Sequence, residues 1–586
     1  MILGMRFSCL TNKASCYKFT HPYFAWSLLA SSLFISTSVL AQSAPNAGAL
    51  QRELDLQLQR ELTVPQTQPV KPERKPDVDT SGEKVTLAGF KFEGNTLFNS
   101  AELNTVIAPW LNKPLSFQEL TEITAAIQDF YSANGRIAQA SFPPQDIENG
   151  VVLISILEGR LGKVDVESAE GKVRFSLEEA KKYISKDPGS NELIDTKPLE
   201  KGLLLLNELP GLSATGVFEP GEAPGTSDFK VRLSETPFFS GQVGLSNYGA
   251  SSTGVGQAVG SLSMNNISGI GDQINLNVIE SLGSNYAVAS YNRPLGTDGL
   301  RFGAQASYLN YETLSSWSDI QTRGTANSFS AFLNYPLLRT LRSSSNVKFN
   351  IEQRNYNNLQ AGNTVSNYQV NAGSLGINGN TFLNERSSLT YGLSYTLGQL
   401  NINDLTQAGQ DLGGPGTAGT YSKINFNVVN RRDLVSLPGA TWTNSLYGQL
   451  ANKNLNSSEQ IYMGGPYGVR AYPVTQGGGS QGAILSSDLV YKIDENWQVG
   501  GFFDVGVVQQ FVNTYPGWQG ATNANNLYLL GDVGLSAKFI YKNMMLDLSL
   551  AYRVGDNPLY NSTGQQLNAD NTYKSLQVWV RQSFTF

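Results

Sequence analysis

One arginine and one tyrosine, Arg470 and Tyr472, stand between glycines and a proline in the stretch GGPYGVRAYPVT (464–475). Glycine and proline at this density predict a loop. A solvated loop does not need a stiff side chain that is always charged, so Arg470 calls for an acidic partner. Asp504, in the strand-like segment WQVGGFFDVGVV (497–508), is the candidate. A bidentate arginine–carboxylate pair would fasten the loop to that strand.

The segment around Asp504 has two distinct faces, because successive side chains of a strand point to opposite sides. Gly500, Phe502, Asp504 and Gly506 share one face, and mainly valine and phenylalanine lie on the other. The two glycines would leave room for an approaching loop. Asp488, in AILSSDLVYK, is a second candidate partner for the arginine. The alternative is that these charges are unrelated and solvated.

Histidine and cysteine are almost absent, which bears on catalysis. Cys9, Cys16 and His21 are the only residues of these types, and all three precede the apolar run FAWSLLASSLFISTSVLA (24–41). Beyond that run, histidine bases, cysteine nucleophiles and the usual zinc ligand sets are excluded. Carboxylate pairs or a Ser–Lys pair remain open, although no spacing favours them. We predict a protein that is not an enzyme and uses no cofactor or metal.

The amino-terminal 41 residues predict export. A basic leader, an apolar run and small residues at Val39 and Ala41 are typical of a secretory signal peptide over residues 1–41. The alternative is an amino-terminal membrane anchor. No later stretch reaches the roughly 18 apolar residues of a spanning helix. The chain would then be periplasmic, secreted or a membrane β-barrel, and a net charge of −6 does not suggest a nucleic-acid binder.

Residues 42–80 predict a short helix followed by a linker. Leucines recur at i, i+4 spacing with charges around them, which indicates an amphipathic helix. These leucines are Leu50, Leu54, Leu58 and Leu62. Prolines between positions 65 and 76 then force an extended linker. The alternative is a frayed terminus without function.

Residues 81–161 and 162–234 predict two copies of one α+β unit in the order β-α-α-β-β. In the first copy, Asn99 and Ser116 each precede a glutamate by three residues, which is the pattern of a helix capping box. Ser176 stands in the same position in the second copy. Tandem copies in an exported chain predict a periplasmic array.

Residues 235–586 lose helical periodicity and alternate apolar with polar side chains, as in INLNV (274–278). Membrane strands of about 9–11 residues, with one face to lipid and one to the lumen, predict about 16 strands over this length. A soluble β-sandwich is the alternative, but the asparagine, serine and charge on the second face favour a wet lumen. The span 452–482 is long enough to fold back into that lumen as a loop.

Taken together, these motifs resemble the two-partner secretion transporters (TpsB proteins, ShlB/FhaC/HecB type), which are outer-membrane relatives of BamA. GVRAY (468–472) is similar to the VRG(Y/F) loop motif of that family, and GFFDVG (501–506) is similar to its F-x-D-x-G strand motif. The resemblance assigns a lumen-loop lock to Gly468, Val469, Arg470, Tyr472, Phe502, Asp504 and Gly506. Ala471 replaces the usual glycine, so the geometry of the loop tip is expected to differ slightly.

The α+β copies carry the same resemblance. GRIAQASFPPQDIENGVVLISILEGRLG (135–162) is similar to the first POTRA domain of the family, and LLLLNELPGL (203–212) is similar to the second. The matching positions in the first copy are Pro143, Gln145, Ile147, Glu158, Gly159 and Arg160.

The resemblance implies a barrel in the outer membrane of a Gram-negative bacterium, plugged by the amino-terminal helix, with two POTRA domains in the periplasm. Its implied task is to export one large partner exoprotein of the TpsA type, such as an adhesin, a cytolysin or a contact-dependent toxin. No nucleotide or membrane potential is used. Outer-membrane lipid and lipopolysaccharide, periplasmic chaperones and the barrel-assembly machinery would be further partners. Nucleic acid would not be a partner, and the chain would act as a monomer.

An unfolded passenger would dock by adding a strand to a POTRA sheet edge, at 136–142 or at 212–218. The candidate residues of the first edge are Arg136, Ile137, Ala138, Gln139 and Gln145. Three rival functions remain: a BamA- or TamA-like assembly factor, a diffusion porin and a periplasmic enzyme. Two periplasmic repeats and a plug helix argue against the first, and the repeats argue against the second. The missing histidine and cysteine argue against the third.

Overall fold

The computed structural model describes residues 46–61, 85–145, 150–169, 171–184, 192–519, 525–560 and 564–586. The predicted signal peptide, the proline-rich linker, Leu62 and Ile147 lie outside these residues. Within them, no helix combines the length and the apolar character needed to cross a membrane.

The first α+β unit follows the predicted order, with short additional pieces. Its elements are β1 (Val85–Thr86), β2 (Gly89–Glu93), α3 (Ser100–Ile107), η1 (Ala108–Trp110), β3 (Pro114–Leu115), α4 (Phe117–Ala133), β4 (Ala138–Ser141) and β5 (Val151–Glu158). Asn99 and Ser116 both form the predicted capping boxes, which satisfy the first backbone N–H groups of α3 and α4. Ile123, Ile127 and Tyr131 of α4 are fully buried in the core of the unit. The main sheet has the order β2-β5-β4, so β4 is an edge strand.

The second α+β unit repeats this plan. Its elements are β6 (Arg160–Ser168), α5 (Leu177–Ile184), α6 (Thr196–Asn207), β7 (Leu212–Pro220) and β8 (Thr226–Glu235). The sheet has the order β6-β8-β7, with β6 parallel to β8, so β7 is an edge strand. Apolar residues of both helices, such as Ile184 and Leu206, pack against the sheet.

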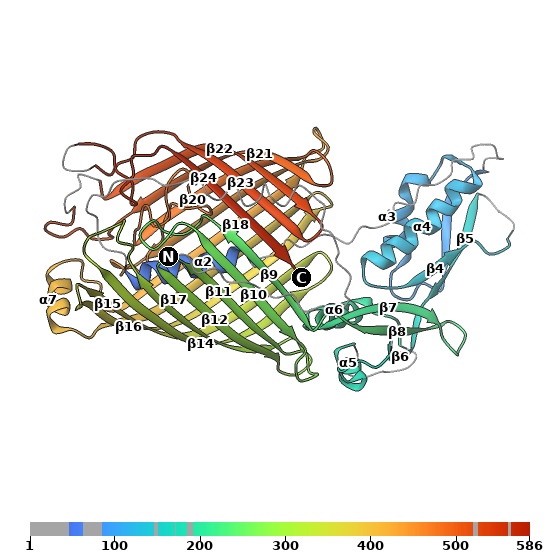
Figure 1. Ribbon diagram of the computed structural model, residues 1–586. Coiled ribbons are helices and arrows are strands. Elements are labelled where there is room, and N and C mark those ends of the chain that lie inside the picture. Colours follow the sequence, from blue (N-terminus) through green and yellow to red (C-terminus); the bar gives the residue numbers. More distant parts are fainter. Residues whose placement is uncertain are drawn as a thin grey trace, which may run out of the picture. The chain divides into compact units, whose positions relative to one another are not determined.

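The rest of the chain forms the predicted barrel of 16 antiparallel strands (Figure 1). These strands are β9 (Phe239–Ser246), β10 (Gln257–Asn265), β11 (Gln273–Ser281), β12 (Ser284–Pro294), β13 (Arg301–Glu312), β14 (Thr322–Arg339), β15 (Ser343–Gln360), β16 (Asn363–Asn384), β17 (Ser387–Ile402), β18 (Gly419–Asp433), β19 (Ala440–Ala451), β20 (Gln481–Lys492), β21 (Trp497–Gln509), β22 (Leu527–Tyr541), β23 (Met544–Arg553) and β24 (Leu576–Thr585). Each strand pairs with its neighbour in sequence, and β24 pairs with β9 to close the barrel. Closure leaves no free sheet edge. A membrane-spanning sheet needs such closure, because unpaired backbone groups at an edge would lie in lipid.

The two ends of the barrel differ in their connections. At the end where β9 begins, turns such as 385–386 and 542–543 are short, whereas the loops 403–418 and 510–526 at the other end are long. Short turns face the periplasm and longer loops face the cell exterior in barrels of this kind. One long loop contains a helix, α7 (Leu405–Gly413).

Four neighbouring strands, β14 to β17, have 18, 18, 22 and 16 residues, far more than the predicted 9–11. The outer face of these strands changes character along its length. Phe349 and Ile351 of β15 are about half exposed on the lipid side. Beyond them towards the exterior, the same face carries glutamine and asparagine, and the side chain of Gln353 donates to that of Asn371 at 3.0 Å. The strands β14 to β17 therefore continue past the lipid towards the exterior, and this extension accounts for their length.

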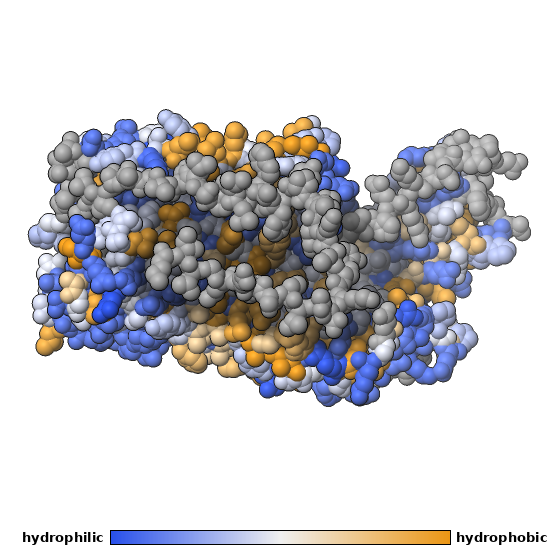
Figure 2. Space-filling model, in the orientation of Figure 1, coloured by the Kyte–Doolittle hydropathy of each residue, from blue (hydrophilic) through white to orange (hydrophobic). Residues whose placement is uncertain are grey.

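Hydrophobic residues gather across the middle of the barrel surface, with hydrophilic residues towards the end that carries α7 (Figure 2). The inner face of β15 is mixed in character. Asn346 and Asn350 face inward low on β15, whereas Tyr356 is buried inward near its outer end. Above the lipid, β15 is thus polar on its outer face, and its inner face carries the buried Tyr356 between the buried polar residues Arg354 and Asn358.

Candidate functional site

Two separate inserts occupy the lumen of the barrel. One is α2 (Ala47–Glu61), the predicted amino-terminal helix, which lies inside the barrel in Figure 1. The other is the loop 452–480 between β19 and β20, which corresponds to the predicted lumen loop. Met463, Val469, Ala471 and Tyr472 of this loop are fully buried and pack against inward-facing residues of the wall.

Arg470 lies at the centre of the contact between the loop and the wall. Its Nε lies 2.7 Å from Asp504 Oδ2 and its Nη2 lies 2.9 Å from Asp504 Oδ1, which is a bidentate pair. Its Nη1 reaches Asp488 Oδ1 at 2.8 Å. The two aspartates that the sequence offered as alternatives therefore bind the same guanidinium together. The guanidinium also stacks on the ring of Phe502, 3.4 Å from its centroid.

One small residue of the wall permits the close approach of the loop, because a Cβ on Gly506 would lie 2.9 Å from Val469 Cγ2. The predicted role of Gly500 is wrong, since a Cβ there would meet only atoms of the wall. A Cβ on Gly468 would lie 2.0 Å from the carbonyl oxygen of Met463, within the loop itself. Tyr472 lies beneath the guanidinium of Arg553, 4.8 Å from its ring centroid. The structure thus brings Gly468, Val469 and Tyr472 of the loop against the wall that carries Asp504.

Two contacts of the loop tip were not anticipated from the sequence. Asp532 of β22 accepts the backbone N–H of Ala471 at 2.7 Å, and the indole N–H of Trp579 on β24 donates to the carbonyl of Arg470 at 2.7 Å. A signal for Asp532 was present, because LGDVG (530–534) repeats the D-V-G of the strand motif. Asp504 and Asp532 lie opposite each other in the register of β21 and β22.

The alanine at position 471 meets no backbone penalty. Among the described residues, positive φ angles in this loop occur at Gly465, Thr475 and Gly477, and Ala471 is not one of them. Ala471 is fully buried, and its methyl group joins the apolar cluster between loop and wall. Substitution of the usual glycine therefore costs no conformational freedom that this loop uses.

A second ionic anchor holds the part of the loop that follows β19, and it was not predicted from the sequence. The side chain of Glu459 is 1% exposed and lies 2.5 Å from Nη2 of Arg354 on β15 and 2.8 Å from Nζ of Lys423 on β18. Lys423 also donates to the carbonyl of Glu459 at 3.0 Å. The loop is therefore fixed to two walls, by an arginine in an acidic site and by a glutamate in a basic site.

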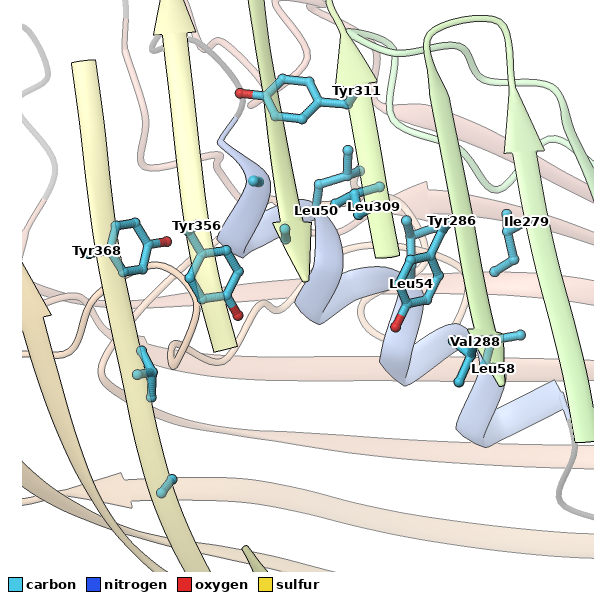
Figure 3. Packing of buried hydrophobic residues seen from close by; sticks show 14 of the residues in the cluster. Leu50, Leu54, Leu58, Ile279, Tyr286, Val288, Leu309, Tyr311, Tyr356 and Tyr368 are labelled. Atoms are coloured by element: carbon cyan, nitrogen blue, oxygen red, sulfur yellow. The ribbon is translucent and has the colours of Figure 1, made fainter. Parts of the chain in front are cut away.

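The helix α2 packs through its leucines on inward-facing residues of β10 to β18, a part of the wall that includes the two strands of the second anchor. Leu50, Leu54 and Leu58 are buried against wall residues that include Tyr286 and Leu309 (Figure 3). The i, i+4 spacing places the three leucines on one face, as predicted.

A few polar contacts also fix the position of α2. Gln51 donates to Ser307 at 2.9 Å, Gln57 donates to Gln257 at 3.0 Å, and the hydroxyl of Tyr286 donates to Asp55.

Both ends of α2 also touch the loop. At one end, the hydroxyl of Ser457 donates to the side chain of Asn46 at 2.9 Å. At the other, Arg60 donates to the carbonyl of Tyr467 at 2.5 Å and lies over the ring of Tyr447, 4.3 Å from its centroid. The two lumen inserts are therefore in direct contact.

The predicted docking edge of the first α+β unit is partly used by the chain itself. Arg136 forms a bridge and an ion pair of 3.6 Å with Asp195, and the carbonyl of Ile137 accepts the N–H of Gly159 at 2.9 Å. Ala138 and Gln139 lie in the edge strand β4. Gln145 follows β4 in the chain, and its side-chain amide bonds both the N–H and the C=O of Leu153 on the side of β5 that faces β4, at 2.6 and 2.7 Å, so these groups are already used within the unit.

Glu158, at the end of β5, explains part of the sequence motif of this unit. Its carboxylate accepts the N–H groups of Thr96 and Leu97 at 2.9 and 2.8 Å and the hydroxyl of Tyr131 at 2.9 Å. Burial alone raises the pKa of Glu158, but hydrogen bonds from Thr96, Leu97 and Tyr131 outweigh it, so its pKa lies below the usual range. Glu158 thus holds the segment before α3 on the sheet.

No site for a metal ion is evident in the part of the chain that the structure describes, where histidine, cysteine, aspartate and glutamate nowhere form a group of three or more that could hold one. The contacts described above are ion pairs, hydrogen bonds and apolar packing.

Comparison with known proteins adds two family matches. Residues 225–524 match the family model of the haemolysin secretion/activation proteins ShlB/FhaC/HecB, and residues 85–159 match the POTRA domain of ShlB type. The first match spans more than half of the chain.

Individual relatives of similar sequence are transporters by name. The heme/hemopexin transporter protein HuxB of Haemophilus influenzae (strain 86-028NP) is 25% identical, covering 94% of this chain and 97% of its own length. The outer membrane transporter CdiB of Dickeya dadantii is 24% identical over 72% of this chain and 74% of its own.

Solved structures show the same fold. CdiB from Escherichia coli superposes with a TM-score of 0.63 at 21% identity, covering 93% of this chain and all of the other. BamA from Haemophilus ducreyi, without its POTRA domains 1–3, superposes at 0.53 with 13% identity, covering 86% of this chain and all of the other.

Proposed function

Because the chain belongs to the family of haemolysin secretion/activation proteins ShlB/FhaC/HecB and is an outer-membrane exporter of a secreted partner protein, we propose that it conducts its partner, unfolded, through the lumen of the barrel. The POTRA domains of this family face the periplasm, so the partner enters from that side. The observation that carries the proposal is the filling of the lumen. One insert, the loop 452–480, is held by buried ion pairs, and the other, α2, is held mainly by leucines.

The unequal attachment of the two inserts suggests their roles. Each buried charge of the loop has a partner of opposite sign on the wall, and separating them would leave charges in a site of low water content. The contacts of the α2 leucines can be supplied by apolar side chains of similar size on another segment, because apolar packing does not require a particular direction of approach. We assign the loop to a fixed part of the conduit and α2 to a plug that leaves when the passenger arrives.

Recognition of the passenger is assigned to the sheet edges of the periplasmic units. β4 and β7 are edge strands, and an extended segment of the passenger can add to such an edge through main-chain hydrogen bonds. Val217 and Phe218 of β7 are each 38% exposed and would offer apolar contacts to it. Arg136 and Ile137 are bonded within the chain. The side chain of Asn207 bonds the N–H and the C=O of Ala214 in β7, so residues 216–218 of β7 and the Ala138–Gln139 part of β4 are the better candidates.

The driving force comes from the passenger. The periplasm supplies no ATP, and a passenger that folds outside the cell gains free energy on that side alone, which prevents its return. We further propose that the protein works as a monomer that uses no cofactor and catalyses no reaction. Lipid and lipopolysaccharide would surround the barrel, and chaperones and the barrel-assembly machinery would act in its biogenesis.

A co-expression experiment tests this function. The chain is produced together with each large open reading frame that adjoins its gene, and the culture supernatant is assayed for the product with and without the chain. We expect the partner outside the cells only when the chain is present. A supernatant that contains equal amounts in both cases would refute the export function.

The same strains address the assembly-factor alternative, which the likeness to BamA supports only at the level of fold. An assembly factor would change the amounts of several unrelated outer-membrane proteins. An exporter would leave them unchanged and would alter the supernatant alone.

A further inference from the structure

The inner wall behind α2 has a composition that a wet lumen does not explain. Six residues from β11, β12, β13 and β15 form an apolar and aromatic surface, which we call the lumen stripe: Ile279, Tyr286, Val288, Leu309, Tyr311 and Tyr356. All six are 7% exposed or less, and all lie at inward positions of their strands. The interior of a wide outer-membrane barrel is ordinarily polar.

The lumen stripe does not hold the barrel together. The barrel is closed by backbone hydrogen bonds between strands, and no second sheet packs against the inner face at this level. In the structure, the stripe is covered by the leucine face of α2 (Figure 3). An apolar surface of this kind marks a contact site for something that is itself apolar.

The polar bonds between α2 and the wall are few and lie beside the stripe. Gln51 and Gln57 bind Ser307 and Gln257, which are outside it. Within it, Tyr286 bonds the side chains of Asp55 and Gln51. The hydroxyl of Tyr311 is already taken up by Asn358 of the wall. Apart from Tyr286, the stripe therefore contacts its occupant through apolar packing, which does not fix the register or the direction of the occupant.

We propose that the lumen stripe is the surface on which the exported polypeptide itself slides, and that α2 covers it as an internal stand-in for a passenger segment with apolar side chains at close spacing. This inference rests on the proposed export function. Once α2 leaves, the stripe would face water, which is unfavourable, unless the passenger covers it. A surface that binds apolar groups without register suits a chain that must keep moving. Plug and passenger then compete for one wall, and arrival of the passenger displaces the plug.

The part of the wall formed by β20, β21 and β22 cannot serve as a surface for the moving passenger. Asp488, Asp504 and Asp532 are engaged by the loop tip, whose removal would leave these carboxylates without partners. Only the wall behind α2 becomes available when a single insert leaves.

The test removes the plug so that the stripe can be judged alone. In a variant that lacks residues 46–61, Val288→Ser and Leu309→Ser are introduced together, and export into the supernatant is measured. Ala287→Ser and Ala306→Ser, on the outer face of the same two strands, form the matched control. Faster migration of the unheated protein in gels verifies that each barrel is folded. We expect a several-fold fall in export for the stripe pair and none for the control pair. Equal export by both pairs would overturn the proposal.

A second measurement does not depend on export. The variant that lacks residues 46–61 is placed in a planar bilayer, and the current is blocked by a synthetic peptide of residues 46–61 or by an unfolded amino-terminal fragment of the secreted partner. We expect the stripe pair to shorten the residence time of both blockers. If it shortens only that of the peptide, the stripe serves α2 alone and the proposal is wrong. If the helix-deleted parent exports nothing, the proposed function fails, whereas these residence times still decide the role of the stripe.

Discussion

The two inserts in the lumen are attached by different physical means. The loop 452–480 is held by charge: Arg470 lies between Asp488 and Asp504, and Glu459 lies between Arg354 and Lys423. The helix α2 is held by three leucines on an apolar wall, by a few hydrogen bonds and, at one end, by Arg60, which binds the carbonyl of Tyr467 and lies over the ring of Tyr447.

Buried charges that lose their partners destabilise a protein strongly, whereas apolar side chains lose a contact that another apolar chain can supply. The lumen therefore combines an insert that we assign as fixed, the loop 452–480, with one that we assign as exchangeable, α2. The clamp formed by Arg470, Asp488 and Asp504 specifies one arrangement of the loop, and the lumen stripe does not specify one arrangement of its occupant.

The largest effect is expected at Arg470. Arg470→Ala leaves Asp504, which is fully buried, and Asp488 without their cation, at a cost of about 3–5 kcal/mol in the attachment of the loop. We expect an inserted barrel and export that is abolished or strongly reduced, as measured in the supernatant. Arg432→Ala, which removes an exposed arginine from β18, is the matched control. Normal export by Arg470→Ala would contradict the role of the clamp.

A charge exchange sharpens this result. Arg470→Asp combined with Asp504→Arg restores one pair but places the new carboxylate beside Asp488 and removes the stacking on Phe502. We therefore expect export between that of Arg470→Ala and that of the wild type. Export no better than that of either single variant would argue against direct pairing.

A smaller effect is expected at the second anchor. Glu459→Gln removes the charge between Arg354 and Lys423, but Glu352 still lies 3.0 Å from Arg354 and compensates in part. We expect reduced export and a lower temperature at which the barrel loses its folded migration in gels. The reduction should be less than for Arg470→Ala, and the reverse order would show that the anchor on β15 and β18 matters more.

Loss of a plug leucine should leave export largely intact. Leu54 is fully buried, and Leu54→Ala should weaken the packing of α2 on the barrel wall by about 2–4 kcal/mol. The expected result is a larger ion conductance in planar bilayers, because the plug leaves more often. Gln59→Ala, on the exposed side of α2, is the control. Unchanged conductance for Leu54→Ala would mean that the leucines do not hold the plug.

The smallest effect lies in the periplasmic unit and depends on pH. The pKa of Glu158 is lower in the folded state than in the unfolded chain, so its stabilisation is present above its ordinary pKa of about 4.3 and is lost as pH falls through the folded value. Glu158→Gln should therefore increase proteolysis of residues 85–159 in the detergent-solubilised protein at pH 7. The difference from wild type should vanish at strongly acid pH, when assayed with an acid protease. A difference that persists there would exclude the carboxylate charge as its cause.

Several features followed directly from local patterns in the sequence. Alternation in 497–508 correctly placed Asp504 inward and Val505 outward, and Asn99 and Ser116 marked the starts of two helices. Patterns of this kind depend on neighbours within a few residues, whose geometry the backbone period dictates. The presence of an unpaired arginine in a loop likewise demanded a carboxylate, because a charge in a confined site needs a partner.

Other features were not visible locally. The excess length of β14 to β17 was missed, because the outer face of a strand becomes polar above the lipid and then looks like a loop or a lumen face in sequence. The stripe could have been suspected from Tyr286 and Val288, which are apolar at inward positions. The partners of Glu459 could not, since Arg354 and Lys423 are distant in sequence and meet it only through the path of the loop.

The sequence by itself determined the periods of the strands, the helix caps and the need of Arg470 for an acidic partner, because each of these rests on short-range geometry or on the cost of an isolated charge. Tertiary structure alone decided that Asp488 and Asp504 share one arginine, that Glu459 has its own basic site, and that α2 covers an apolar wall. The physical reason is that strand register and the course of a long loop bring together residues separated by tens to hundreds of positions, and no local period records that distance.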